Sequence, residues 1–163
     1  MMWPVLLISL CLLLHKSFAW PDFMEQMFGG LRAKEQMCVR GKLRCGPSDA
    51  VGDTVVGLWD VDTGTADDEM GFASPDPDGF FEVCGAARDW SGSIDPAIEI
   101  YTVCGNEPSR CVAGCDSATD CYRVIPFEID QIFIGKTFHF EDEIDINEYF
   151  PGEFLKCGSP YDH

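Results

Sequence analysis

Eight cysteines follow an N-terminal secretion signal in this chain, and no other feature limits its fold as strongly. Residues 1–19 contain an apolar run from Val5 to Leu14 and then the small residues Ser17 and Ala19, a pattern typical of a signal peptide that is cleaved after residue 19. The run is too short to cross a bilayer. Cleavage leaves 163 − 19 = 144 residues, a usual length for one domain with its own core.

The cysteines predict disulfides, because the signal directs the chain to an oxidising compartment in which thiols pair. Cys11 leaves with the signal, so the remaining number is even and we expect four bridges with no free thiol. A zinc site of four thiolates in the second half of the chain is the alternative. The oxidising compartment disfavours it. The eight remaining cysteines are Cys38, Cys45, Cys84, Cys104, Cys111, Cys115, Cys121 and Cys157.

The mature chain is strongly acidic, which limits its partners. Lys16 also leaves with the signal, so 11 − 1 = 10 basic side chains face 28 acidic ones and the formal charge is −18. Nucleic acids and bare anionic membranes are bound mainly through Lys and Arg, so we exclude both as partners. Repulsion between like charges also opposes self-association. We expect a secreted monomer, outside the cell or at its surface, with no transmembrane segment.

After residue 37 the apolar residues alternate with polar ones at a period of two, which predicts strands. Val39 and Leu43 alternate with Arg40, Lys42 and Arg44, so this strand has one buried face and one basic face. Turn residues separate at least seven such segments, which favours a mainly β, two-sheet sandwich. We expect strands at residues 38–45, 54–62, 70–73, 80–84, 98–104, 121–127 and 134–141.

Residues 20–37 form an N-terminal extension in which apolar side chains recur at helical spacing. A short amphipathic helix there has two uses, packing on the domain surface or docking a partner; disorder is the third interpretation. The candidates for partner binding are Trp20, Phe23, Met24, Met27 and Phe28.

Several short motifs then occur in a fixed order: VRGKLRC (39–45), VGLWDVDT (56–63), PDGFFEV (77–83), IDP (94–96), IEIYTVC (98–104) and CYR (121–123), with IG (134–135) and Cys157 after them. Together they resemble the nematode transthyretin-like family of secreted proteins. The resemblance covers residues 38–157 and leaves 158–163 as a tail.

The resemblance implies a transthyretin-like β-sandwich of seven to eight strands with a short helix, and an extracellular role without catalysis. The partner it implies is a protein, a lipid or a small apolar ligand. Family spacing also suggests bridges Cys104–Cys121 and Cys45–Cys157, and it leaves the pairing of Cys111 and Cys115 open. The chain departs from the family pattern at Thr102, where a His is usual, and in the longer loop between Cys104 and Cys121.

Other constellations offer little chemistry. His139 and His163 belong to no acid-base motif, and the C-terminus lacks the Tyr-Arg-Gly-Ser of the hydroxyisourate hydrolases, which share the fold. We therefore expect no enzyme activity, cofactor or metal. A group of carboxylates offers calcium ligands, but its spacing matches no EF-hand loop, and a solvated acidic face is the favoured interpretation. These carboxylates belong to Asp60, Asp62, Asp67, Asp68 and Glu69.

Overall fold

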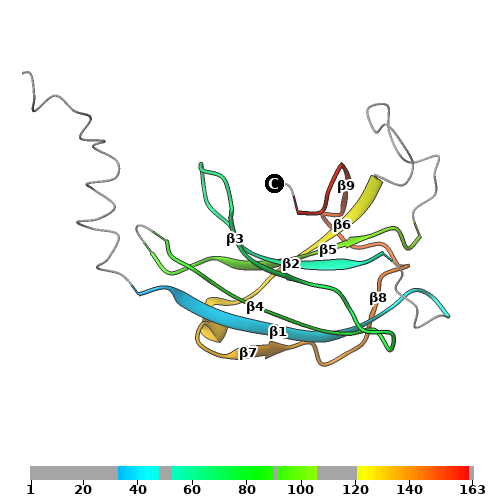
Figure 1. Cartoon of the computed structure of the whole chain (residues 1–163), viewed down its shortest axis with the longest axis horizontal. Coiled ribbons are helices and arrows are strands. Elements are labelled where there is room, and N and C mark those ends of the chain that lie inside the picture. The colour runs from blue at the N-terminus through cyan, green and yellow to red at the C-terminus, as the bar shows by residue number, and fades with distance from the viewer. Residues whose placement is uncertain (1–32, 48–52, 90–91, 106–120, 162–163) are drawn as a thin grey trace, which may run out of the picture. The chain divides into compact units, whose positions relative to one another are not determined.

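The computed structural model describes residues 33–47, 53–89, 92–105 and 121–161, and nine strands form within these ranges (Figure 1). A single turn of 3-10 helix, η3 (Gln131–Phe133), follows β6 and begins at Asp130, whose carboxylate accepts a hydrogen bond from the N–H of Ile132. The strands are β1 (Glu35–Arg44), β2 (Val55–Asp60), β3 (Asp68–Ala73), β4 (Phe80–Ala87), β5 (Pro96–Thr102), β6 (Cys121–Glu128), β7 (Thr137–His139), β8 (Ile144–Asp145) and β9 (Phe154–Cys157).

The strands form two sheets that face each other across one core. One sheet has the order β4-β1-β7, with β8 paired to the end of β1, and the other has the order β3-β2-β5-β6-β9. In Figure 1 they are the lower and upper layers of the sandwich. Strand alternation points one side chain in two inward. The fully buried side chains include Val39, Leu43, Val56, Leu58, Ile98, Ile100 and Ile125.

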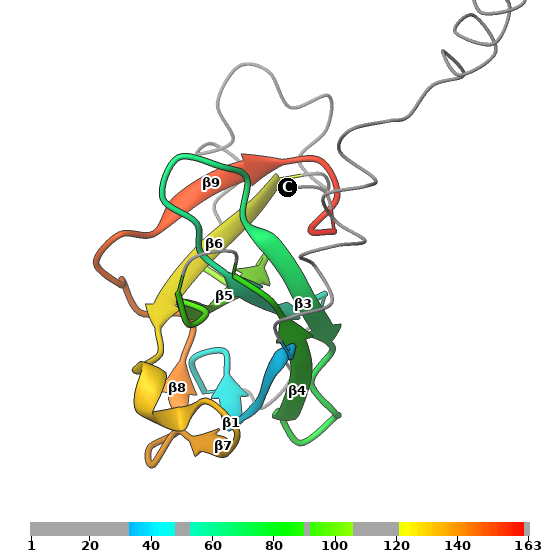
Figure 2. The ribbon, with the colours of Figure 1, turned by 90° about the vertical axis from the view of Figure 1, so that its left-hand side faces the viewer.

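A corner between the sheets brings β3 and β4 into close backbone contact, and Figure 2 shows the two strands crossing there. Gly85 makes this contact possible. A Cβ on Gly85 would lie 2.3 Å from the carbonyl oxygen of Met70, closer than two non-bonded atoms can approach. The missing side chain therefore determines how tightly this corner closes.

The structure confirms the predicted β-sandwich and shifts several strand boundaries. β1 begins at Glu35, so residues 35–37, which we had assigned to the N-terminal extension, belong to the first strand of the domain. Asp68 and Glu69 lie in β3, not in a connecting loop. β7 is shorter than the expected strand at 134–141, because a turn after η3 occupies residues 134–136 and the strand ends at His139. β8 and β9 were not predicted from the sequence.

The two disulfides whose ends both lie in the described residues correct the family-based pairings. Cys45 is bonded to Cys104, so neither Cys104–Cys121 nor Cys45–Cys157 forms. The reason is tertiary: Cys45 follows the end of β1 in one sheet, Cys104 follows the end of β5 in the other, and the sandwich brings these ends together. Cys38 is bonded to Cys84, its register partner across β1 and β4.

Cys121 and Cys157 are also disulfide-bonded, so every cysteine that the structure describes is oxidised. Cys111 and Cys115 lie outside the described residues. The five aromatic and methionine candidates between residues 20 and 28, and His163, lie outside them too. Among the residues described, no helix is long and apolar enough to cross a membrane.

Candidate functional site

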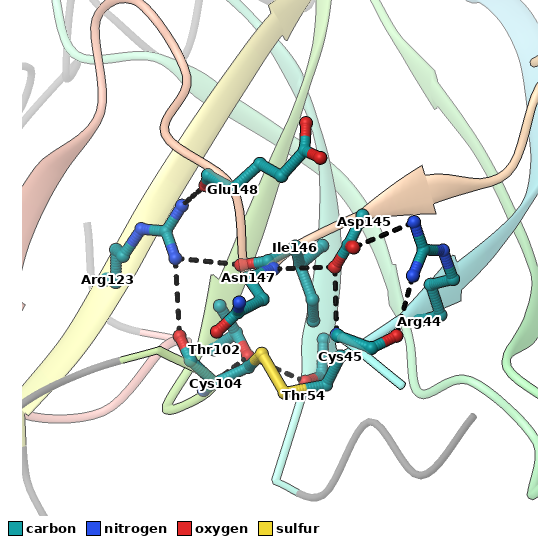
Figure 3. The surroundings of a disulfide bond; sticks show 11 residues. Arg44, Cys45, Thr54, Thr102, Cys104, Arg123, Asp145, Ile146, Asn147 and Glu148 are labelled. Atoms are coloured by element: carbon teal, nitrogen blue, oxygen red, sulfur yellow. Dashed lines mark hydrogen bonds and ion pairs between the residues drawn. A yellow bond between two sulfur atoms is a disulfide. The ribbon is translucent and has the colours of Figure 1, made fainter. Parts of the chain in front are cut away.

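A buried arginine organises one end of the sandwich, at the Cys45–Cys104 disulfide (Figure 3). Arg123 lies on β6 with only 5% of its surface exposed. One guanidinium nitrogen donates to the carbonyls of Cys104, at 3.3 Å, and Ile146, at 2.7 Å. The other donates to the carbonyl of Glu148 and forms an ion pair of 2.8 Å with Glu153. The forked shape of the guanidinium lets one side chain hold these segments at once.

On the other side of the disulfide, Asp145 holds the C-terminal end of β1 and the turn that follows it. Its carboxylate accepts hydrogen bonds from the N–H groups of Gly46 and Asn147 and forms an ion pair of 2.8 Å with Arg44. Burial alone would raise the pKa of Asp145, but the two N–H groups and the guanidinium outweigh it and lower the pKa. The carboxylate is therefore ionised and fixes the turn that carries Cys45.

Thr102, where the family usually has His, lies inside this end of the fold. It is fully buried, and its hydroxyl is 3.0 Å from the hydroxyl of Thr54 and accepts a hydrogen bond from the N–H of Cys104. The side chain is therefore used in holding β5 to the residue before β2. We interpret this end as structural, because its polar groups are satisfied by one another.

The acidic residues proposed as calcium ligands surround the end of β2. Asp60 is buried, its Oδ1 accepts from the N–H of Asp95 at 2.7 Å, and its Oδ2 has no hydrogen-bond partner. Burial and then the charges of Asp62, Asp89 and Asp68 raise the pKa of Asp60, against the hydrogen bond from Asp95. Burial and then the charges of Asp68, Asp89 and Asp67 raise the pKa of Asp62.

A metal site requires several ligand atoms close together, and the acidic residues do not provide one as they stand. In the described ranges, three potential ligand atoms lie within 4.8 Å of one another only in the group Cys38, Glu82 and Cys84. The two sulfur atoms of this group are joined as a disulfide, so they are not thiolate ligands. The calcium interpretation of Asp60 and its neighbours stays untested.

The outer face of the five-stranded sheet is unusually apolar. Val55, Tyr101 and Val124 are register partners on β2, β5 and β6 and form a second buried cluster outside the main core. Phe72 on β3 packs against this cluster, and Tyr161 stacks edge-on against Phe72 at 4.8 Å between ring centroids. Tyr161 of the C-terminal tail thus covers part of this face.

Trp59 lies on the same face, next to this cluster. Gly57 makes room for it, because a Cβ there would lie 2.6 Å from the indole nitrogen. Tyr101 lies on the same face, and its hydroxyl donates a hydrogen bond to the carboxylate of Glu99. Burial and then the bond to Glu99 raise the pKa of Tyr101 well above its ordinary value, so the phenol stays protonated.

A groove of about 470 Å³ opens beside Trp59, and we call it the Trp59 groove. Its floor is a register row across three strands, Trp59 on β2, Ala97 on β5 and Glu128 on β6. The small side chain of Ala97 leaves the space between its larger neighbours. The other residues that line the groove are Val61, Thr63, Asp67, Asp95, Pro96, Glu99, Pro126, Phe127 and Ile129.

A larger and shallower groove, of about 640 Å³, lies on the four-stranded sheet and includes His139. Its charges are mixed, and several are already paired. Arg40 forms an ion pair of 2.6 Å with Glu82, and Lys42 one of 2.9 Å with Glu143. The predicted basic face of β1 is thus present and is balanced by carboxylates of neighbouring segments.

Sequence reasoning found the strands that carry the Trp59 groove but not the groove itself. Of the five calcium candidates, Asp67 alone lines it. Glu99 and Tyr101 belong to the motif at residues 98–104, which indicated the family but not a binding site. Alternation could have shown that Ala97, Glu99 and Tyr101 share one face of β5, but their neighbours on β2 and β6 come from the register of the sheet.

A disulfide-bonded β-sandwich with a groove on the outer face of one sheet defines the class of this protein. The model of the transthyretin-like family matches residues 40–130. Transthyretin-like protein 5 of Caenorhabditis elegans is 34% identical over 125 residues, which are 73% of this chain and 81% of that protein. The chain belongs to the transthyretin-like family.

A solved structure, a 9R-lipoxygenase from Cyanothece PCC8801, is also similar over 96% of this chain. The similarity spans 25% of that protein, with a TM-score of 0.42 and 15% sequence identity. At this level it supports no conclusion about fold or activity.

Proposed function

We propose that this chain is a secreted, non-enzymatic binding protein that holds a small ligand with an apolar body in the Trp59 groove. The observation that carries the proposal is the hollow at Ala97, with Trp59 on one side and Glu128 on the other. Its volume, about 470 Å³, falls in the range of about 300–1,000 Å³ that small-molecule sites occupy. A few polar groups among apolar walls are typical of such sites.

The residues that line the groove support binding more than catalysis. Among the described residues that line it there is no histidine, cysteine, lysine or serine, so the common pairs of such a nucleophile with a histidine base are absent from the lining. The tyrosine behind the groove, Tyr101, is held protonated. The competing proposal is a passive interaction protein of the extracellular matrix. Such a protein would not require the groove.

Native extraction tests the proposal. The full chain is secreted from eukaryotic cells, purified without detergent and extracted with organic solvent, and the extract is analysed by mass spectrometry. We expect a compound that copurifies in near-stoichiometric amount. Ala97→Leu should abolish its retention, because the larger side chain fills the hollow.

Ala86→Leu is the matched control, because Ala86 lies on β4 and lines a different hollow on the other sheet. It should retain the compound, and thermal melting should show that both variants are folded. A wild-type protein that carries no compound, or a compound retained equally by both variants, would overturn the assignment of the groove.

A further inference from the structure

We infer that the Trp59 groove selects organic cations, specifically a primary or substituted ammonium group attached to an apolar body. This inference rests on the proposed function and adds the chemical class of the ligand. It follows from the charges around the groove. Four carboxylates line it, those of Asp67, Asp95, Glu99 and Glu128, and none of the described residues of the lining is a lysine, arginine or histidine.

Two of these carboxylates are held by neutral donors. Asp67 accepts a hydrogen bond from the backbone N–H of Asp62, and Asp95 accepts one from the side-chain amide of Gln131 at 2.6 Å. Glu99 accepts one from the hydroxyl of Tyr101. The donors to Asp67 and Asp95 are neutral, so they orient these two carboxylates without cancelling their charge.

The basic side chains of the fold are concentrated elsewhere. Arg40, Lys42 and Arg44 project from β1 on the opposite sheet, where their carboxylate partners are Glu82, Glu143 and Asp145. Lys156 lies on the same face as the groove, 5.2 Å above the ring of Tyr101. It does not line the groove. A cation that enters the groove therefore meets only negative side chains among the charged residues that the structure describes in its lining.

An acidic chain exposes carboxylates over much of its surface, so the charge alone is not selective. The groove differs because its carboxylates surround apolar walls. Val61, Pro126 and Ile129 line it together with Ala97, and the exposed fraction of Val61 is 43%. An ammonium group near the rim and a hydrocarbon body against these walls match the two kinds of surface, whereas a bare metal ion satisfies only the first.

The probe is 2-phenylethylammonium, titrated into the full mature protein by calorimetry and by saturation-transfer NMR. Two molecules of nearly the same shape serve as comparisons, neutral 2-phenylethanol and anionic 3-phenylpropionate. We expect the cation to bind at least about fivefold more tightly than the alcohol at low salt, and the anion not to bind. The preference should shrink as salt is added.

Glu128→Gln should weaken binding of the cation about threefold without changing binding of the alcohol, because it removes one charge and keeps the shape. Glu141→Gln is the control, since Glu141 is an exposed carboxylate of the other groove. It should leave both affinities unchanged. Ala97→Leu should abolish binding of both the cation and the alcohol, with its melting temperature as the check on folding.

Equal affinity for the alcohol and the cation, with both lost in Ala97→Leu, would overturn the inference and leave the proposed function standing. The inference also fails if no probe binds. In that case the extraction experiment decides on the proposed function separately. Binding of the cation that survives Ala97→Leu would place the cation outside the groove and overturn the inference as well.

Discussion

Arg123 joins β6 to the segment between β8 and β9 and to Cys104 after the end of β5, because its buried guanidinium contacts three carbonyls and one carboxylate. Asp60 is its opposite, a buried carboxylate with one oxygen that lacks a partner. A buried charge stabilises a fold only where its partners compensate for the lost hydration. The two residues should therefore respond to substitution in opposite directions.

Arg123→Gln should lower the free energy of unfolding by about 3 to 5 kcal/mol, because Glu153 is left as a buried charge without its partner. Arg123→Lys should lower it by less, since the charge returns without the forked geometry. Chemical denaturation of the mature protein measures both. In the control Arg40→Gln, an exposed pair with Glu82 is lost, which should cost at most about 1 kcal/mol. Equal effects at the two sites would contradict the structural role of Arg123.

Asp60→Asn should raise the melting temperature at pH 7. The pKa of Asp60 is raised above 3.8, mainly by burial, so the wild-type fold holds this proton more tightly than the unfolded chain and loses stability as pH rises through that pKa. The amide keeps an acceptor for Asp95 and removes the charge. We expect a gain of about 3 °C at pH 7, or roughly 1 kcal/mol, which disappears near pH 3.5.

Asp78→Asn is the control for the loss of one acidic charge, because Asp78 is exposed in the turn before β4. It should change the melting temperature little at either pH. A lower melting temperature of Asp60→Asn at pH 7 would contradict the prediction and would mean that the ionised carboxylate has a favourable partner, such as a bound cation.

At the scale of elements, the corner between β3 and β4 and the Cys45–Cys104 bridge connect the two sheets at separate places. The disulfide closes a separation of 59 residues, which on the chain-entropy model stabilises by about 4 kcal/mol. The corner depends on close backbone approach at Gly85. The disulfide thus stabilises the fold by restricting the unfolded chain, whereas the corner at Gly85 stabilises it through packing in the folded state.

Gly85→Ala should destabilise the fold by about 2 kcal/mol or more, because the new methyl group collides with backbone atoms that cannot rotate away. Gly92→Ala is the control: its Cβ would meet only the side-chain oxygen of Asp89, at 3.2 Å, and a rotating side chain can adjust. Thermal melting of both variants measures the difference. A Gly85→Ala protein as stable as wild type would show that β3 and β4 are not as close as the structure has them.

At the scale of the whole molecule, charge is divided between the two outer faces. The four-stranded sheet carries basic side chains that are balanced by carboxylates, and the five-stranded sheet carries the Trp59 groove with carboxylates alone. The net charge of the sequence could not reveal this division, because it does not show where the charged side chains lie in the fold. The proposed selection of ligands by charge therefore depends on the positions of the charged side chains in the fold and not on their sum.

Alternation and turn residues determined the sandwich from the sequence alone, because the strand period and the turn chemistry are local properties. The order of the short motifs indicated the family, because this order can also be read directly from the sequence. The pairing of Cys45 with Cys104, the burial of Thr102 and the neighbours of Trp59 were decided only by the tertiary structure. Each depends on which strand ends meet and on the register between strands, and both are set by packing the whole core at once.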